Sequence, residues 1–180
     1  MSQSWIGKTA INTIKQSYLF EANNLGFKTI AESDVDYLLM LASADPKAWS
    51  SNCDEVKEKI KNDKKYYSEK GYGAFLVFEL NSGEFIGRAG FGDIESGEIE
   101  VGYVVLEKYR GKGYATMMLK SLLLWAQHNI KKDKIIAITK TCHVASYRVM
   151  QKTGMVFSRK DTIDGVDCVV YEHQLRQATE

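Results

Sequence analysis

The sequence predicts a single α/β domain in which helices cover one sheet that is mostly antiparallel. Three apolar segments lie close together within residues 74–106, and only the glycine-containing turns NSGE and ESGE separate them, which is typical of an antiparallel meander. Residues 114–129 repeat apolar positions every three or four residues, as an amphipathic helix does. An apolar strand follows at 134–139, so the sheet continues after this helix.

The chain before the meander predicts one strand and two helices. Residues 1–20 have no clear period and are expected to form an N-terminal extension that packs on a single domain, residues 21–180. Residues 25–31 predict the first strand, and Ser33 or Asp34 is expected to cap the helix that follows. The charged segment 54–71 predicts a surface helix that ends at a glycine.

The meander and the segments after it complete the sheet. Its strands are expected at 74–80, 84–94 and 98–106. The third strand has a polar face with Glu98, Glu100 and Gly102, and it becomes wholly apolar only near Val104. Two further predicted elements follow the strand at 134–139, namely a short helix at 143–154 and a final hairpin formed by 155–161 and 166–175.

Composition excludes several classes of protein. The chain has 180 residues and a formal net charge of +1, which gives no support for general nucleic-acid or membrane binding. Its longest apolar run, SLLLWA, is too short to span a bilayer. The three cysteines, Cys53, Cys142 and Cys168, lack CxxC spacing, which favours reduced thiols in a cytoplasmic protein over a disulfide framework or a metal site.

A glycine turn joins the third strand of the meander to the helix at 114–129. Gly111 and Gly113 carry no side chains that would keep an anion from the first amides of this helix, which have no partners inside it. Lys108, Arg110 and Lys112 add positive charge, so the turn predicts an anion cradle. The alternative is a flexible helix entry with solvated lysines. The spacing fits neither a P-loop nor a GxGxxG dinucleotide fingerprint.

Two motifs resemble one known family. RGKGYA, residues 110–115, matches the R/Q-x-x-G-x-G/A signature of the GNAT acetyltransferases, and EVGYVVLEKYRGKGYATMML around it resembles the strand, loop and helix of that family. HVASYRVMQKTGM, residues 143–155, is similar to the N-x-x-S-x-R-V-L-x-K-x-G-F segment of the RimJ/RimL branch. The resemblance is specific from about Glu84 to Phe157.

This resemblance implies a fold and a co-substrate. The fold is a twisted mixed sheet of about seven strands, with helices on both faces and with strands four and five splayed apart around acetyl-CoA. The backbone of Val104, Val105 and Leu106 is expected to bind the pantetheine arm. The diphosphate is expected to lie on the segment formed by Arg110, Gly111, Lys112, Gly113, Tyr114, Ala115 and Thr116.

The resemblance also implies candidate catalytic residues. Glu100 corresponds to a carboxylate that acts as a base or orients the amine, although an exposed strand glutamate is the alternative. Ser146 corresponds to a serine whose hydroxyl either bonds the thioester sulfur or caps the helix. His143 replaces an asparagine that contacts pantetheine, and Met150 stands where many relatives have a tyrosine acid. No metal is implied, and Tyr103 is assigned to the core.

The functional hypothesis is an acetyl-CoA-dependent N-acetyltransferase. It would move the acetyl group by direct attack in a ternary complex to a primary amine, either a protein N-terminus or a small molecule. An acyl-cysteine intermediate on Cys142 is disfavoured because no neighbouring base is evident apart from His143. Two alternatives are a catalytically silent CoA-binding regulatory module and an acetyltransferase that acts on aminoacyl-tRNA. Similar proteins are often homodimers.

Overall fold

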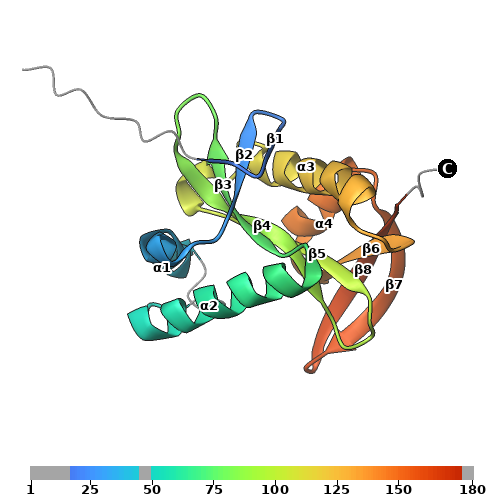
Figure 1. Cartoon of the computed structure of the whole chain (residues 1–180). Helices are drawn as coiled ribbons and strands as arrows, with labels where there is room; N and C mark the ends of the chain where they lie inside the picture. The colour runs from blue at the N-terminus through green and yellow to red at the C-terminus, as the bar shows by residue number, and fades with distance from the viewer. Residues whose placement is uncertain (1–16, 45–49, 176–180) are drawn as a thin grey trace, which may run out of the picture.

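The computed structural model describes residues 17–44 and 50–175, which form one eight-stranded sheet covered by helices on both faces (Figure 1). The strand order is β1-β2-β3-β4-β5-β6-β8-β7. In chain order the elements are β1 Phe20–Ala22, β2 Leu25–Thr29, α1 Val35–Ala44, α2 Cys53–Lys70, β3 Ala74–Glu79, β4 Phe85–Asp93, β5 Ile99–Val105, α3 Tyr114–Asn129, β6 Lys134–Lys140, α4 Val144–Lys152, β7 Val156–Ile163 and β8 Val166–Gln174.

Each segment predicted as a helix or strand is one, with ends that shift by one or two residues, and α3 has the predicted bounds. The sheet has one strand more than the seven expected, because β1 folds back on β2. Asn23 and Asn24 form the turn of this hairpin with φ of 51° and 61°, a left-handed conformation that asparagine tolerates. Of the predicted N-terminal extension, residues 1–16 lie outside the described residues.

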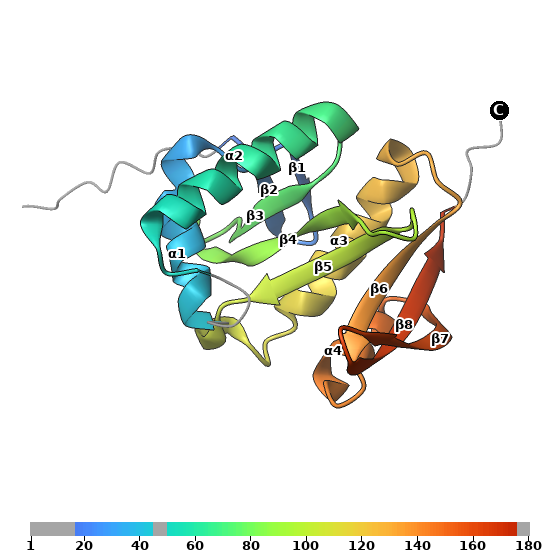
Figure 2. The same cartoon turned by 90° about the horizontal axis from the view of Figure 1, so that it is seen from below.

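The helices cover opposite faces of the sheet, and Figure 2 shows α1 and α2 in front with α3 and α4 behind. Under α3, aromatic rings fill the space against the sheet. Trp125 stacks on Phe91 and on Phe20 with ring centroids 5.7 Å apart in both pairs. Phe75 meets the edge of Trp125 at 5.6 Å, so this cluster fixes α3 against the centre of the sheet.

The sheet opens between β5 and β6, its parallel pair. The pairs β4–β5 and β6–β8 each have seven matched residues, whereas β5 and β6 share the single match of Glu100 with Ile136. We call the opening beyond this match the splay, and Figure 2 shows the two strands diverging there. The splayed strands that the resemblance implied are therefore present, and the parallel junction is where a ligand can enter the sheet.

Ion pairs hold the closed end of this junction. Glu98, which precedes β5, lies 3.5 Å from Lys134 Nζ on β6 and 2.8 Å from Arg159 Nη2 on β7. Lys134 is also 3.0 Å from Glu172 on β8. These contacts join β5 to the C-terminal half of the sheet beside Glu100, so the splay begins at a fixed point.

Candidate active site

The loop from β5 to α3 has a backbone that requires its glycines. Gly111 and Gly113 have φ of 75° and 87°, in the left-handed region that other residues rarely adopt. A Cβ added at either position would meet no atom within 4 Å. The requirement is therefore conformational, and the space in front of both glycines is open.

The start of α3 offers unpaired backbone amides. Met117 is the first α3 residue whose amide bonds back into the helix, to the Gly113 carbonyl at 3.1 Å. No side chain of the described chain caps the helix at Gly113, and its first turn holds no acidic residue. The amides of Tyr114, Ala115 and Thr116 thus face the open space with the positive end of the helix dipole.

Cations lie beside these amides in fixed positions. Tyr109 is buried, and its ring lies 4.6 Å from Lys108 Nζ and 5.6 Å from Lys112 Nζ. Arg110 Nε donates to the Val105 carbonyl at 3.3 Å, which holds its guanidinium at the end of β5. The structure thus brings the predicted cations to the glycine turn.

At the end of β5, the backbone carbonyl groups of Val104 and Val105 point in different directions. A Cβ on Gly87 would lie 2.0 Å from the Val104 carbonyl oxygen, so this carbonyl faces β4. Leu106 donates its amide to Ile86 at 3.0 Å and accepts from Tyr109 at 2.9 Å. The Val105 carbonyl accepts from the Arg110 side chain and faces away from β4. Of the three predicted pantetheine contacts, Val105 is therefore the best oriented.

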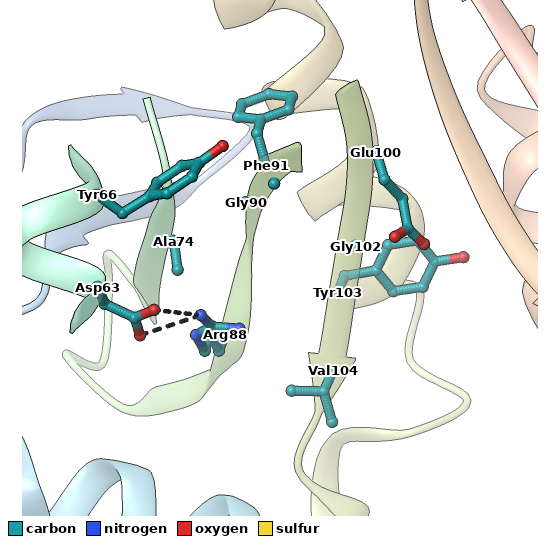
Figure 3. Close-up of a pocket in the computed structure, with 11 residues that line it drawn as sticks. Asp63, Tyr66, Ala74, Arg88, Gly90, Phe91, Glu100, Gly102, Tyr103 and Val104 are labelled. Carbon is teal, nitrogen blue, oxygen red and sulfur yellow. Dashed lines mark hydrogen bonds and ion pairs between the residues drawn. The ribbon is translucent and has the colours of Figure 1, made fainter. Parts of the chain in front are cut away.

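Glu100 is half-buried at the start of the splay. Burial raises the pKa of its carboxyl group, and a backbone hydrogen bond from Ile138 on β6 partly opposes this rise. Figure 3 shows Glu100 and Tyr103 projecting to the same side of β5. The alternative of an exposed strand glutamate does not describe this environment.

A pocket of about 420 Å³ lies between α2 and strands β3 to β5, and Glu100 is one of its lining residues. Arg88 on β4 binds Asp63 on α2 through Nη2, at 3.1 Å and 3.3 Å from the two carboxylate oxygens (Figure 3). The remaining lining residues are Tyr66, Ala74, Gly90, Phe91, Gly92, Gly102, Tyr103 and Val104. The pocket opens on the α2 face, whereas the glycine turn leads into α3, so two molecules could reach Glu100 from different sides.

The start of α4 carries the remaining predicted residues. His143 occupies the N-cap position and has an exposed side chain, with Nδ1 3.4 Å from Thr139 Oγ1. Ser146 lies three residues further on and pairs with Tyr103, so the alternative in which Ser146 caps the helix is wrong. Met150 is buried with 2% exposure, which gives it a packing role.

Tyr103 is the site residue that reasoning from sequence missed. Its alternation with Val101 placed it on an apolar face, and its ring does pack against the core. Its hydroxyl nevertheless lies 3.2 Å from Ser146 Oγ, and its ring lines the pocket. No pattern in the sequence reveals this contact, because Ser146 lies 43 residues away on another element.

Within the described ranges, no group of three or more His, Cys, Asp or Glu side chains could hold a metal ion. Cys53 and Cys142 are exposed free thiols, and Cys168 is a buried one. None of the described helices is long and apolar enough to cross a membrane.

The splay between β5 and β6, the uncapped start of α3 and the half-buried Glu100 are compatible with a transferase that takes a nucleotide-linked donor. The family model for the acetyltransferase (GNAT) domain matches residues 24–156. The chain therefore belongs to the GNAT family of acetyltransferases and is an acyltransferase.

Curated relatives agree with this assignment over part of their length. An uncharacterized N-acetyltransferase of Bacillus subtilis, YjdG, is 28% identical over 96 residues, which cover 51% of this chain and 55% of the relative. An uncharacterized protein of the same organism, YkkB, is 30% identical over 112 residues, covering 59% and 65%. The chain thus matches 55% and 65% of the length of these relatives, less than two thirds in both cases.

Solved structures share the fold over nearly their whole length. A GNAT-family protein of Bordetella pertussis has a TM-score of 0.76 at 17% identity, covering 85% of this chain and 97% of that one. A RimL ribosomal-protein acetyltransferase solved with coenzyme A has a TM-score of 0.72 at 18% identity, covering 86% and 96%. A ribosomal-protein-S5-alanine acetyltransferase of Vibrio fischeri has a TM-score of 0.73 at 17% identity, covering 87% and 96%.

Proposed function

We propose that the protein transfers the acetyl group of acetyl-CoA to a primary amine by direct attack in a ternary complex. The observation that carries this proposal is the position of Glu100. It lies where β5 and β6 separate, it lines the pocket on the α2 face, and its strand leads directly into the glycine turn of α3. A donor in the splay and an acceptor in the pocket would meet beside its carboxylate.

The donor would be held by backbone groups and cations that are already in place. The diphosphate of acetyl-CoA would occupy the open space at the start of α3, beside the amides of residues 114–116, and the loop before it carries Lys108, Arg110 and Lys112. The pantetheine arm would extend along β5 and bond the backbone at Val105. His143, exposed at the start of α4, could donate or accept one further hydrogen bond from a ring nitrogen.

The acceptor must lose a proton before its nitrogen can attack. At pH 7 this costs roughly 1.4 kcal/mol for an α-amine with a pKa of about 8, and about 4.6 kcal/mol for a lysine near 10.4. Glu100 would take this proton, directly or through a water molecule. Burial raises the pKa of Glu100, which makes its carboxylate a stronger base than an exposed glutamate.

The departing thiolate needs a proton in return. Ser146 presents a hydroxyl at the start of α4, across the splay from β5, and we assign it as the donor. Attack by the neutral amine forms the C–N bond and leaves on nitrogen a second proton, which Glu100 takes up after it has passed the first to solvent. Collapse of the tetrahedral intermediate breaks the C–S bond, and Ser146 donates a proton to the sulfur. Cys142 needs no part in this sequence.

The preferred acceptor class is a protein N-terminus. An α-amine needs less help from a weak base such as Glu100 than a lysine does, as the costs above show. Neighbours of the same fold include RimL, a ribosomal L7/L12 alpha-N-protein acetyltransferase, which favours the same acceptor class here. Small amines such as spermidine and aminoglycosides remain the comparison substrates.

Thiol release with a panel of amines tests the proposal. The panel contains ribosomal N-terminal peptides, spermidine and aminoglycosides, each with acetyl-CoA. We expect turnover with at least one peptide, and about 100-fold lower kcat for Glu100→Gln. Glu95→Gln, in the exposed turn before β5, is the matched control and should keep full activity.

Two results would contradict this account. Tight acetyl-CoA binding without turnover on any amine would identify a silent CoA-binding module instead. An unchanged rate for Glu100→Gln would remove the assignment of the base but would leave the transferase activity standing.

A further inference from the structure

A single side chain joins the two sides of the splay. Tyr103 belongs to β5, and its hydroxyl oxygen lies 3.2 Å from Ser146 Oγ and 3.2 Å from the Ser146 carbonyl oxygen on α4. In Figure 3 Tyr103 projects to the same side of β5 as Glu100, while the Asp63–Arg88 pair lies on the other side of the strand. The hydroxyl of Ser146 is therefore in contact with a second hydroxyl from the opposite strand.

Tyr103 has one hydroxyl proton, so it can donate to only one of its two neighbours at a time, the Ser146 carbonyl oxygen or Ser146 Oγ. When Tyr103 donates to the Ser146 carbonyl, the serine hydroxyl can donate to Tyr103 in turn. When Tyr103 donates to Ser146 Oγ, the serine proton is free to point elsewhere. Both contacts are long for O–H···O bonds, whose usual length is about 2.7–2.8 Å. The exchange between these two arrangements therefore gives up little hydrogen-bond energy.

Among the described residues, Tyr103 is the side chain that hydrogen-bonds Ser146 Oγ. The position that holds a tyrosine acid in many relatives is Met150, which is buried and has no proton to donate. His143 has an exposed ring whose Nδ1 faces Thr139, so its contact is with β6. The phenol of Tyr103 is the polar side-chain group that the structure places against Ser146 Oγ.

We propose that Tyr103 is a positioning residue that turns the Ser146 hydroxyl toward the thioester sulfur and replaces the proton that Ser146 gives up. This proposal rests on the proposed function. As the C–S bond breaks, Ser146 Oγ–H passes its proton to the thiolate and Tyr103 passes its own to Ser146 Oγ. The amine nitrogen gives up two protons in all: the ammonium proton goes to solvent before attack, and the proton lost after attack passes through Glu100 and water to the Tyr103 phenolate. The products are therefore the amide, the CoA thiol and one proton released to solvent, with no further reactant.

The surroundings of Tyr103 suit this part. Its ring is half-buried, and burial raises the pKa of its hydroxyl while the bond to Ser146 lowers it. The phenol is thus neutral and carries its proton throughout the physiological range. A buried phenolate is a short-lived species, so reprotonation by water follows each turnover.

Tyr103→Phe tests the proposal because phenylalanine keeps the ring and removes the hydroxyl. We expect the single-turnover rate constant, measured with enzyme in excess over acetyl-CoA, to fall about ten-fold. The KM for acetyl-CoA should stay unchanged, since the hydroxyl acts after the donor is bound. Tyr72→Phe is the matched control, because it removes a hydroxyl that bonds Asp93 at 2.7 Å, and its rate should equal that of the wild type.

A double-mutant cycle separates positioning from packing. In a Ser146→Ala background there is no serine proton to direct, so adding Tyr103→Phe should lower the rate by less than about two-fold. Two independent structural effects would multiply instead. A full ten-fold loss in that background, or a Tyr103→Phe enzyme as fast as the wild type, would overturn the proposal. Absence of turnover in the wild type would instead count against the proposed function itself.

Discussion

The two longest helices begin in opposite ways. Asn52 caps α2 by accepting from the amides of Asp54 and Glu55 through Oδ1, at 2.8 Å and 3.3 Å, and both of these acids lie in the first turn. The start of α3 has Gly113 in the cap position, no capping side chain within the described chain and no acid in its first turn. The free amides and the dipole are therefore neutralised from within at α2 and left open at α3.

The difference shows that local stability was given up at α3. A side-chain cap is worth about 1 kcal/mol to a helix, and an acid near the dipole adds a few tenths more. At α2, a surface helix, both the side-chain cap and the acids are present and stabilise the first turn. At α3 a side-chain cap would occupy the place proposed for the diphosphate of acetyl-CoA, and an acid there would repel it. Packing of Trp125 and its neighbours against the sheet holds α3 instead.

The strongest way to break this comparison is to give α3 the acids of α2. Ala115→Asp with Thr116→Glu copies the positions of Asp54 and Glu55. We expect the Kd for acetyl-CoA to rise about 100-fold, because two carboxylates would face the diphosphate. Calorimetric titration measures this change. The matched control is Ala115→Asn with Thr116→Gln, which has the same shape without charge and should retain most of the affinity.

A smaller effect should follow from Gly113→Ala. The added Cβ meets no atom within 4 Å, so the change tests the φ of 87° alone. We expect a loss of about 1 kcal/mol in the free energy of unfolding and about ten-fold weaker acetyl-CoA binding, since the strained turn relaxes away from the cradle. Gly113→Asn, which tolerates this conformation better, should lose less stability. Equal stability of all three proteins would contradict the conformational argument.

Removing the cap from α2 should lower stability and leave acetyl-CoA affinity unchanged. Asn52→Ala is expected to lower the free energy of unfolding by about 1 kcal/mol, seen as a melting temperature roughly 2–4 °C lower. Acetyl-CoA affinity should not change, because this helix start binds no ligand in the proposal. Any loss of affinity beyond two-fold would show that the two helix starts are coupled.

The smallest expected effects come from replacing a single carboxylate by an amide. Glu55→Gln removes a negative charge that interacts favourably with the dipole of α2, so it should slightly lower the free energy of unfolding at pH 7.5. Glu100→Gln should raise the melting temperature at that pH, because burial raises the folded-state pKa of Glu100.

The pH dependence follows from that direction. Because the pKa of Glu100 is higher in the folded state than in the unfolded state, its carboxyl group does not oppose folding at pH values below the unfolded-state pKa. The folded state loses this advantage as the pH rises through the folded-state pKa, since the ionised carboxylate is then partly buried. The gain from Glu100→Gln should therefore shrink as the pH falls and be largely gone near pH 3, about one unit below the unfolded pKa of about 4.3, where the carboxyl group is mostly protonated in both states. A gain that persists at about pH 3 would point to packing.

Part of the site could be read from the sequence because it is local. The glycine turn lies within seven consecutive residues, so its position between a strand and a helix was predicted, whereas the left-handed φ of Gly111 and Gly113 was not. The bounds of α3 followed from its apolar period for the same reason. The β1–β2 hairpin was missed although it is local, because Asn23 and Asn24 were not recognised as a two-residue turn.

Contacts between distant segments could not be read in this way. The burial of Glu100 depends on β6 and on where that strand separates from β5. The bond between Tyr103 and Ser146 joins residues on different elements, and the orientation of the Val104 carbonyl depends on Gly87 of β4. Periodicity carries no information about any of these pairings.

The sequence alone thus determined the order of the helices and strands apart from β1, the position of the glycine turn and the resemblance to an acetyltransferase family. These features depend on short-range sterics and on side-chain periods of two or 3.6 residues, and both can be recognised from residues that are close together in the sequence. The tertiary structure decided which carboxylate is buried, which backbone groups face the splay and which hydroxyl meets Ser146. Desolvation and hydrogen bonding between distant residues depend on their positions in space, so they arise only when the strands and helices have packed together.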